Sequence, residues 1–180
     1  MNSLKGFKVA ILVADGFQQI EMTGPKEALD QAGALALIVS PVKGKVKGFK
    51  GQEWGDEFLV DKALDQAKAE DFDGLILPGG SLSPDTLRDN PIAVDFVKGF
   101  IKSDKPIAAI CRGSLILINA GDVKGKKMTS WPSIKEDLIK AGALWEDNEV
   151  VKAGYMITSR NPGDVPVFSA ATVDLFSKFC

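Results

Sequence analysis

Cys111 is the residue whose type and local sequence best support nucleophilic chemistry. Residues 107–110 form a short apolar run entered through Pro106, and the segment after Gly113 is long enough for about two helical turns. This pattern predicts a strand, a sharp turn and a helix, with Cys111 at the turn. The amides that open the helix would favour a thiolate over a thiol, which predicts a pKa well below that of a free cysteine.

A structural role for Cys111 is the alternative, because free cysteine is among the most buried residue types and packs as a small hydrophobe. The local sequence leaves both interpretations open. The chain has two cysteines, Cys111 and Cys180, and no histidine. It therefore has no Cys-His dyad, no disulfide framework and no conventional zinc site, and we expect neither a metal nor a cofactor.

Glu21 is a candidate partner for Cys111. The apolar run 8–14 is typical of a strand buried on both faces, and Pro25 suits the first position of the next helix. Glu21 is therefore expected in the loop or first turn after the first strand. In a doubly wound sheet that loop lies at the carboxyl ends of the strands, as does Cys111. A solvated loop carboxylate, or one that favours a helix N-terminus, is the alternative.

Strands and helices alternate along the chain, which predicts an α/β sandwich with a mainly parallel sheet. Asn90 is expected to cap a helix, and residues 43–51, which alternate lysine with glycine and apolar residues, predict an exposed hairpin. Four short apolar runs have the length and composition of buried strands: 8–14, 35–40, 72–77 and 107–110.

Composition limits the classes of partner. The 180 residues are 45% hydrophobic and 26% charged, with no linker, so we expect one domain over residues 1–180. A net charge of -2 gives no basic surface for nucleic acid. No apolar run approaches the roughly 20 residues that span a bilayer, and the first residues lack the pattern of a signal peptide. We therefore expect no nucleic-acid or membrane partner and a cytoplasmic location.

Four segments resemble, in their order and spacing, those of the ThiJ/PfpI family, the parkinsonism-associated deglycase superfamily. They are 72–80, 108–113, 128–132 and 157–162. The motif Ala-Ile-Cys-x-Gly, with Leu-Pro-Gly-Gly about thirty residues upstream, is far more specific than either part alone. The chain looks most similar to the general-stress-protein and PfpI-like intracellular protease branch. This resemblance implies a flavodoxin-like (class I glutamine-amidotransferase-like) sandwich and a homodimer or higher homo-oligomer.

The resemblance also implies roles for individual residues. Cys111 matches the family nucleophile at its elbow, and Glu21 matches its carboxylate partner. Asp85 matches an acidic position that can reach the active site of a neighbouring subunit. The backbone positions that form the family's oxyanion pocket correspond to three glycines, namely Gly79, Gly80 and Gly113.

Arg112 departs from the family pattern, because the hydrolytic branch has histidine after the nucleophile. A guanidinium stays protonated, so Arg112 cannot take a proton from Cys111, and weak peptidase activity is expected. Gln18 is a second departure, at a frequent family glutamate. Two interpretations of Arg112 remain: a clamp for a substrate carboxylate, or a surface or interface arginine held by Asp or Glu.

Addition of a thiolate to an aldehyde carbon, with Glu21 moving the proton, does not need a histidine. The resemblance and the departure at Arg112 together favour a cysteine-dependent stress-protection enzyme acting on small reactive carbonyls or their adducts, of the glyoxalase or deglycase type. One alternative is a PfpI-type intracellular peptidase or amidase with peptide substrates. Another is a non-catalytic redox sensor whose Cys111 is oxidised reversibly.

Overall fold

In this computed structural model, which describes residues 3–180, the middle layer is a seven-stranded sheet with the order β11-β12-β8-β7-β1-β3-β6. Neighbouring strands are parallel except β11 and β12. The strands are β1 (Lys8–Leu12), β3 (Leu35–Ser40), β6 (Lys62–Ala63), β7 (Gly74–Leu77), β8 (Ile107–Ile110), β11 (Val151–Ala153) and β12 (Met156–Ser159). Five of these strands, numbered 1 to 5 along the chain, are β1, β3, β7, β8 and β12. Their order across the sheet is 2-1-3-4-5, which is the flavodoxin-like order. The predicted α/β sandwich is confirmed.

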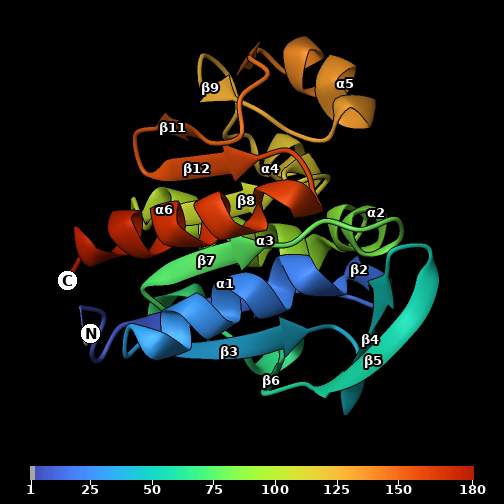
Figure 1. Cartoon of the computed structure of the whole chain (residues 1–180), viewed down its shortest axis with the longest axis vertical. Helices are drawn as coiled ribbons and strands as arrows, with labels where there is room; N and C mark the ends of the chain where they lie inside the picture. The colour runs from blue at the N-terminus through green and yellow to red at the C-terminus, as the bar shows by residue number, and fades with distance from the viewer. Residues whose placement is uncertain (1–2) are drawn as a thin grey trace.

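Helices cover both faces of this sheet (Figure 1). On one face, α1 (Gln19–Gln31) packs against α6 (Val165–Ser177), and α3 (Pro91–Lys102) and α4 (Leu115–Ala120) cover the other. Because successive strand residues point to opposite faces, Val9 and Ile11 of β1 join the core beneath α1 and α6. Ala10 and Leu12 join the core beneath α3 and α4. Each face thus buries its own hydrophobic cluster.

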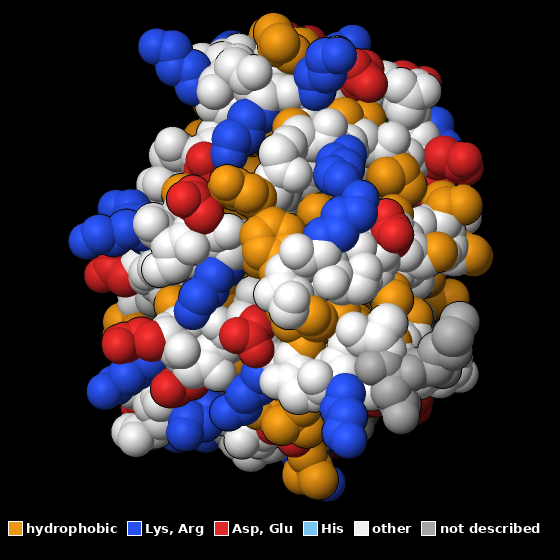
Figure 2. All heavy atoms as spheres, turned by 90° about the vertical axis from the view of Figure 1, so that its left-hand side faces the viewer, with side chains coloured by type: hydrophobic (Ala, Val, Ile, Leu, Met, Phe, Trp, Pro, Cys, Tyr) orange, Lys and Arg blue, Asp and Glu red, His pale blue; other side chains and the backbone are white. Residues whose placement is uncertain are grey.

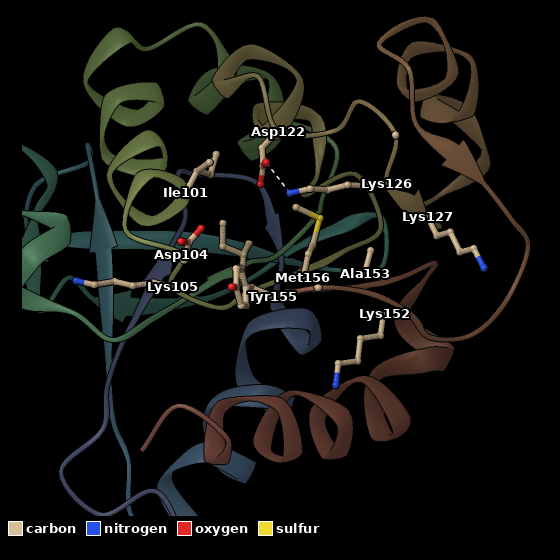
Figure 3. A pocket seen from close by; sticks show the side chains of 13 residues that line it. Ile101, Asp104, Lys105, Asp122, Lys126, Lys127, Lys152, Ala153, Tyr155 and Met156 are labelled. Atoms are coloured by element: carbon tan, nitrogen blue, oxygen red, sulfur yellow. Dashed lines mark hydrogen bonds and ion pairs between the residues drawn. The ribbon is translucent and has the colours of Figure 1, made fainter.

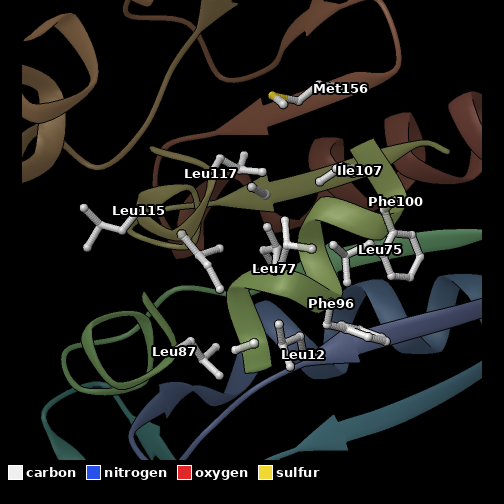
Figure 4. Close-up of a cluster of buried hydrophobic side chains, with 14 of the residues drawn as sticks. Leu12, Leu75, Leu77, Leu87, Phe96, Phe100, Ile107, Leu115, Leu117 and Met156 are labelled. Atoms are coloured by element: carbon white, nitrogen blue, oxygen red, sulfur yellow. The ribbon is translucent and has the colours of Figure 1, made fainter. Parts of the chain in front are cut away.

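Aromatic side chains of α3 belong to the hydrophobic cluster that lies beneath α3 and α4. Figure 4 shows Phe96 and Phe100 beside Leu75 and Leu77 of β7. The Phe96 and Phe100 rings meet edge to face, with centroids 5.1 Å apart. As predicted, Asn90 caps this helix, its side-chain oxygen accepting hydrogen bonds from the first-turn amides. The cap and the apolar face together fix α3 against the sheet.

A second sheet lies beyond the carboxyl ends of the central strands, at the right of Figure 1. It has the order β2-β4-β5 and consists of β2 (Phe17–Gln18), β4 (Lys45–Lys50) and β5 (Glu53–Leu59). β4 and β5 are antiparallel and form a hairpin, but residues 43–51, predicted to be the whole hairpin, supply only its first strand and the start of its turn. Its tip lies next to the candidate site described below.

The remaining elements are short. None of the helices in residues 3–180 is both long enough and apolar enough to cross a membrane. The short elements that complete the fold are α2 (Ser83–Arg88), β9 (Lys127–Met128), α5 (Lys135–Lys140), β10 (Leu144–Trp145) and four 3-10 turns at Leu64–Gln66, Ala69–Asp71, Pro132–Ile134 and Pro162–Asp164.

The start of α1 differs from the prediction. The helix begins at Gln19, so Pro25 lies inside it and not at its first position. A proline there removes one helical hydrogen bond. The helix nevertheless buries the apolar side chains Met22 and Leu29 on the side that faces the sheet and α6, and this burial opposes the local preference. Glu21 consequently occupies the first turn of α1, as expected.

Candidate active site

Cys111 lies at a strained turn between β8 and α4. Its φ angle is +63°, a left-handed conformation that non-glycine residues rarely adopt. The backbone on both sides is fixed, because Cys111 N–H donates to the Ser159 carbonyl and Trp131 N–H donates to the Cys111 carbonyl, each at 3.0 Å. The turn needs a glycine at 113, where a Cβ atom would lie 2.0 Å from the Leu77 carbonyl oxygen. The predicted elbow is therefore present, and its side chain is 9% exposed.

Glu21 lies behind the sulfur, on the first turn of α1. The side chain is fully buried, Oε1 accepts a hydrogen bond of 2.9 Å from Gly79 N–H, and the carboxyl interacts with the Cys111 thiol. Oε2 is buried and has no conventional hydrogen-bond partner among the described residues, so it can carry the acidic proton. The structure thus brings Cys111 and Glu21 together, although they are far apart in the sequence.

Gly79 makes this close approach possible. A Cβ atom at that position would lie 2.6 Å from Cys111 Cβ and 2.7 Å from Glu21 Oε1. Any larger residue would separate the thiol from the carboxyl or displace both.

The backbone amides nearest the sulfur belong to Gly80 and Arg112, and both favour negative charge on it. Gly80 has a φ angle of +131°, which a side chain would strain. The other two glycines assigned to the oxyanion pocket use their N–H groups elsewhere: Gly79 donates to Glu21, and Gly113 donates to the Ile110 carbonyl. The Gly80 and Arg112 amides are thus the ones beside the sulfur, while Gly79 and Gly113 allow close packing, and the oxyanion role of the three glycines stays a prediction.

Burial controls the protonation of the pair. It raises the pKa of Glu21 to about 8, against the lowering effect of the hydrogen bonds from Gly79 and Cys111. The carboxyl is consequently protonated at neutral pH.

Burial and the charge of an ionised Glu21 likewise raise the pKa of Cys111, against the lowering effect of the two amides. The prediction of a pKa well below that of a free thiol is therefore wrong. The local sequence indicated helix amides, but α4 begins only at Leu115, and the sulfur is desolvated beside a carboxyl. Groups this close titrate as a pair, so the first proton leaves the pair as the pH approaches about 8.

Arg112 turns away from the sulfur and toward Asp85 of its own chain. Nη2 donates to both oxygens of the Asp85 carboxylate, at 3.0 and 3.1 Å. Nη1 donates to the carbonyls of Gly80, at 2.9 Å, and Ser81, at 3.3 Å. Of the two interpretations of Arg112, the structure shows the arginine held by an acidic residue. A role for Asp85 across a subunit interface stays a prediction.

A pocket of about 400 Å³ opens above Cys111. The hairpin tip forms one wall and is held by the Gln18 side chain, which accepts from Gly51 N–H at 3.1 Å and donates to the Gly51 carbonyl at 3.4 Å. Among the described residues, no group of three His, Cys, Asp or Glu side chains is arranged to hold a metal ion. The pocket is lined by Gln18, Gly51, Gln52, Gly80, Ser81, Cys111, Arg112, Trp131 and Pro162.

The sequence analysis did not assign six of these lining residues to the site: Gln18, which was noted only as a departure from the family, Gly51, Gln52, Ser81, Trp131 and Pro162. Trp131 and Pro162 lie in segments that carry the family resemblance, and Ser81 directly follows Gly80, so position in the chain gave a signal for these three. The hairpin tip gave none, because an exposed hairpin does not reveal which part of the fold it covers.

Comparison with known proteins agrees with this geometry. The DJ-1/PfpI family model matches residues 7–175. General stress protein 18 of Bacillus subtilis is 38% identical over 174 residues, which are 96% of this chain and 99% of that protein. Protein/nucleic acid deglycase 2 of Escherichia coli is 38% identical over 170 residues, 93% of this chain and 96% of that protein.

Among solved structures, Drosophila melanogaster DJ-1beta superposes with a TM-score of 0.86 at 28% identity, covering 95% of this chain and 90% of that chain. The flavodoxin-like fold and the resemblance found in the sequence are both confirmed. This chain belongs to the DJ-1/PfpI family.

Proposed function

We propose that this protein is a stress-protection enzyme that uses Cys111 to act on small reactive carbonyl compounds or their adducts. The observation that carries the proposal is the buried Cys111–Glu21 pair at the floor of a pocket, with the Gly80 and Arg112 amides beside the sulfur. The names of the relatives, a general stress protein and a deglycase, support the same class of function.

In the proposed first step, the Glu21 carboxylate takes the proton of the Cys111 thiol as the sulfur adds to the aldehyde carbon of a compound such as methylglyoxal. A carbon–sulfur bond forms, and the carbonyl π electrons move to the oxygen. The Gly80 and Arg112 N–H groups would stabilise this oxygen, and the protonated Glu21 carboxyl would supply its proton. The product is a hemithioacetal, and Glu21 is left as a carboxylate.

In the second step, the Glu21 carboxylate removes the proton from the former aldehyde carbon and returns it to the adjacent carbonyl carbon. Together with transfer of the hydroxyl proton from the former aldehyde oxygen to the neighbouring oxygen, this step converts the hemithioacetal into a thioester of a 2-hydroxy acid. Water then cleaves the carbon–sulfur bond, releasing the 2-hydroxy acid and restoring the thiol. Overall, methylglyoxal and water give lactate, with no external oxidant or reductant.

The test is turnover of methylglyoxal by the protein and by Cys111→Ser, with Cys180→Ser as the matched control for a cysteine outside the pocket. We expect activity in the unmodified protein and in Cys180→Ser, and none in Cys111→Ser. Equal turnover with and without Cys111 would contradict the proposal. A stable sulfenic or sulfinic acid at Cys111, with no carbonyl turnover, would favour the redox-sensing alternative.

The peptidase alternative is tested with a fluorogenic peptide and Arg112→His. Arg112 cannot accept the thiol proton, so we expect nearly no peptide hydrolysis by the unmodified protein and a gain in the histidine variant. Equal peptidase rates in both proteins, abolished by Cys111→Ser, would show that Arg112 is no obstacle to hydrolysis.

A further inference from the structure

The pocket above Cys111 contains very few side chains that can carry a charge. Its lining consists of amides, glycines, a serine, a tryptophan and a proline, together with Cys111 and Arg112. Arg112 is thus the one cationic side chain among the lining residues that the structure describes. Whether the pocket attracts anions therefore depends on the state of this guanidinium.

The Arg112 guanidinium is already engaged. Nη1 is directed to the Gly80 and Ser81 carbonyls, and Nη2 to both oxygens of Asp85. A substrate carboxylate binds arginine best through two parallel hydrogen bonds, from Nη2 together with either Nη1 or Nε, and Asp85 occupies the Nη2 that both pairs need. The Arg112 side chain is 20% exposed and that of Asp85 is 53% exposed, so the carboxylate lies on the solvent side of the pair. Asp85 therefore compensates the charge of Arg112 where an incoming anion would meet it.

The second charge near the pocket is negative. When the Cys111–Glu21 pair loses its first proton, one negative charge is left at the pocket floor, where it repels anions. With Arg112 compensated by Asp85, no free cationic side chain in the lining opposes this repulsion.

We propose that Asp85 is a specificity-determining residue: by pairing with Arg112, it makes the pocket select uncharged carbonyl compounds over those that carry a carboxylate. Methylglyoxal would be preferred over glyoxylate, and removing the Asp85 charge would shift the preference toward glyoxylate. The identity of the substrates rests on the proposed function. The charge selection is a property of the pocket that can be measured without turnover.

The test uses two alkylating reagents of nearly the same size, neutral iodoacetamide and anionic iodoacetate, on a Cys180→Ser background. In each reaction the Cys111 sulfur attacks the methylene carbon, a carbon–sulfur bond forms, and iodide leaves. The ratio of the two rates, divided by the same ratio for a small free thiol, reports the electrostatic selectivity at Cys111. We expect this ratio to favour iodoacetamide in the starting protein.

Asp85→Asn should raise the relative rate of iodoacetate by about twofold to fivefold, because a partly solvent-screened charge close to the pocket contributes on this scale. The asparagine keeps the size and the hydrogen-bonding oxygen of the side chain. Asp89→Asn is the matched control, since Asp89 is an exposed aspartate at the C-terminal cap of the same helix, and it should change the ratio less than twofold. Adding Arg112→Met to Asp85→Asn should return the ratio to the starting value.

An unchanged ratio in Asp85→Asn, with the circular dichroism spectrum of the starting protein, would overturn the inference. So would a starting protein that reacts faster with iodoacetate than the free-thiol reference predicts. A second arm compares turnover of methylglyoxal and glyoxylate by the same variants. If the alkylation ratio shifts but neither compound is turned over, the proposed function fails and the charge selection stands.

Discussion

At the carboxyl ends of the central strands, a pocket of about 400 Å³ opens on Cys111, whereas at their amino ends a larger pocket of about 470 Å³ opens between charged side chains. Figure 3 shows this second pocket, with Asp104, Tyr155 and Met156 at its centre. Lys126 is paired with Asp122. The amines of the other lysines, Lys105, Lys127 and Lys152, point in different directions (Figure 3).

The same end of the sheet is seen in space-filling form in Figure 2, where basic and acidic side chains alternate with apolar ones. This pocket is lined by no cysteine, and its four lysines exceed its two aspartates, with Lys126–Asp122 as the ion pair between lining residues that the structure shows. At the carboxyl end, by contrast, a thiol, a buried carboxyl and two amides converge on one atom. The comparison teaches that convergence of polar groups, and not cavity volume, identifies the site.

The largest expected effect on turnover distinguishes Glu21, at the carboxyl ends of the central strands, from Asp104, at their amino ends. Glu21→Gln should lower turnover of methylglyoxal by about 10²- to 10⁴-fold, because it removes the group that moves protons. Asp104→Asn changes a carboxylate in the amino-end pocket, at a φ angle of +54° that asparagine tolerates, and should change turnover less than twofold. Similar losses in both variants would remove the distinction between the two ends.

The second prediction concerns stability. The pKa of Glu21 is raised from 4.5 to about 8 on folding, so the folded state holds a proton that the unfolded state releases. The contribution of this proton to the stability of the folded state is complete below pH 4.5 and is lost as the pH rises to about 8. The free energy of unfolding falls in that window by about 1.4 kcal/mol per pH unit. The chain has no histidine, so few other groups titrate in this window.

Urea unfolding at pH 5, 6, 7 and 8 measures this slope. Glu21→Gln should flatten it, because the amide does not titrate, whereas Asp104→Asn should leave it unchanged. A free energy of unfolding that does not fall with pH in the starting protein would show that Glu21 is ionised in the fold.

The third prediction compares glycines at the two ends. Gly79→Ala should destabilise the fold by about 1–3 kcal/mol and abolish turnover, because its Cβ would overlap Cys111 and Glu21. Gly154→Ala, at the amino end, meets open space, and its φ of +60° should cost about 1 kcal/mol with turnover retained. Thermal unfolding and methylglyoxal turnover together check both variants, and an active Gly79→Ala protein would contradict the close packing.

The smallest expected effect concerns the hairpin. Gln18→Ala removes the two hydrogen bonds to Gly51 and should raise KM severalfold with little change in kcat, since about 1 kcal/mol of positioning is lost. Gln19→Ala is the comparison, because Gln19 bonds the same hairpin at Asp56, away from the pocket lining. Equal KM values in both variants and the starting protein would mean that the hairpin wall does not contact substrate.

Local signals predicted much of the site. The apolar run before Cys111 gave the elbow, and the helix after it ends at Gly121, which has the left-handed φ of +84° of a helix C-cap. The run 8–14 placed Glu21 at the correct edge of the sheet. The start of α1 was not predictable from Pro25, because burial of apolar side chains such as Met22 favours an earlier start.

Features that depend on distant contacts could not be predicted in the same way. The pKa of Cys111 depends on burial beside Glu21, and the local helix amides suggested the opposite direction. The pairing of Arg112 with Asp85 joins residues 27 positions apart, and the contact between Gln18 and the hairpin tip joins residues 33 positions apart. The sequence supplied these residues, but only the fold determines which of them meet.

The central claim is that Cys111 and Glu21 act as one titrating pair, and the pH dependence of Cys111 alkylation tests it most directly. Iodoacetamide rates would be measured from pH 5 to 10 on a Cys180→Ser background, with and without Glu21→Gln. We predict a midpoint above that of a free thiol in the starting protein, and a midpoint at least one pH unit lower in the Glu21→Gln variant, because the carboxylate charge that raises the pKa of Cys111 is removed. An unchanged midpoint would show that the two groups titrate independently and would contradict the account.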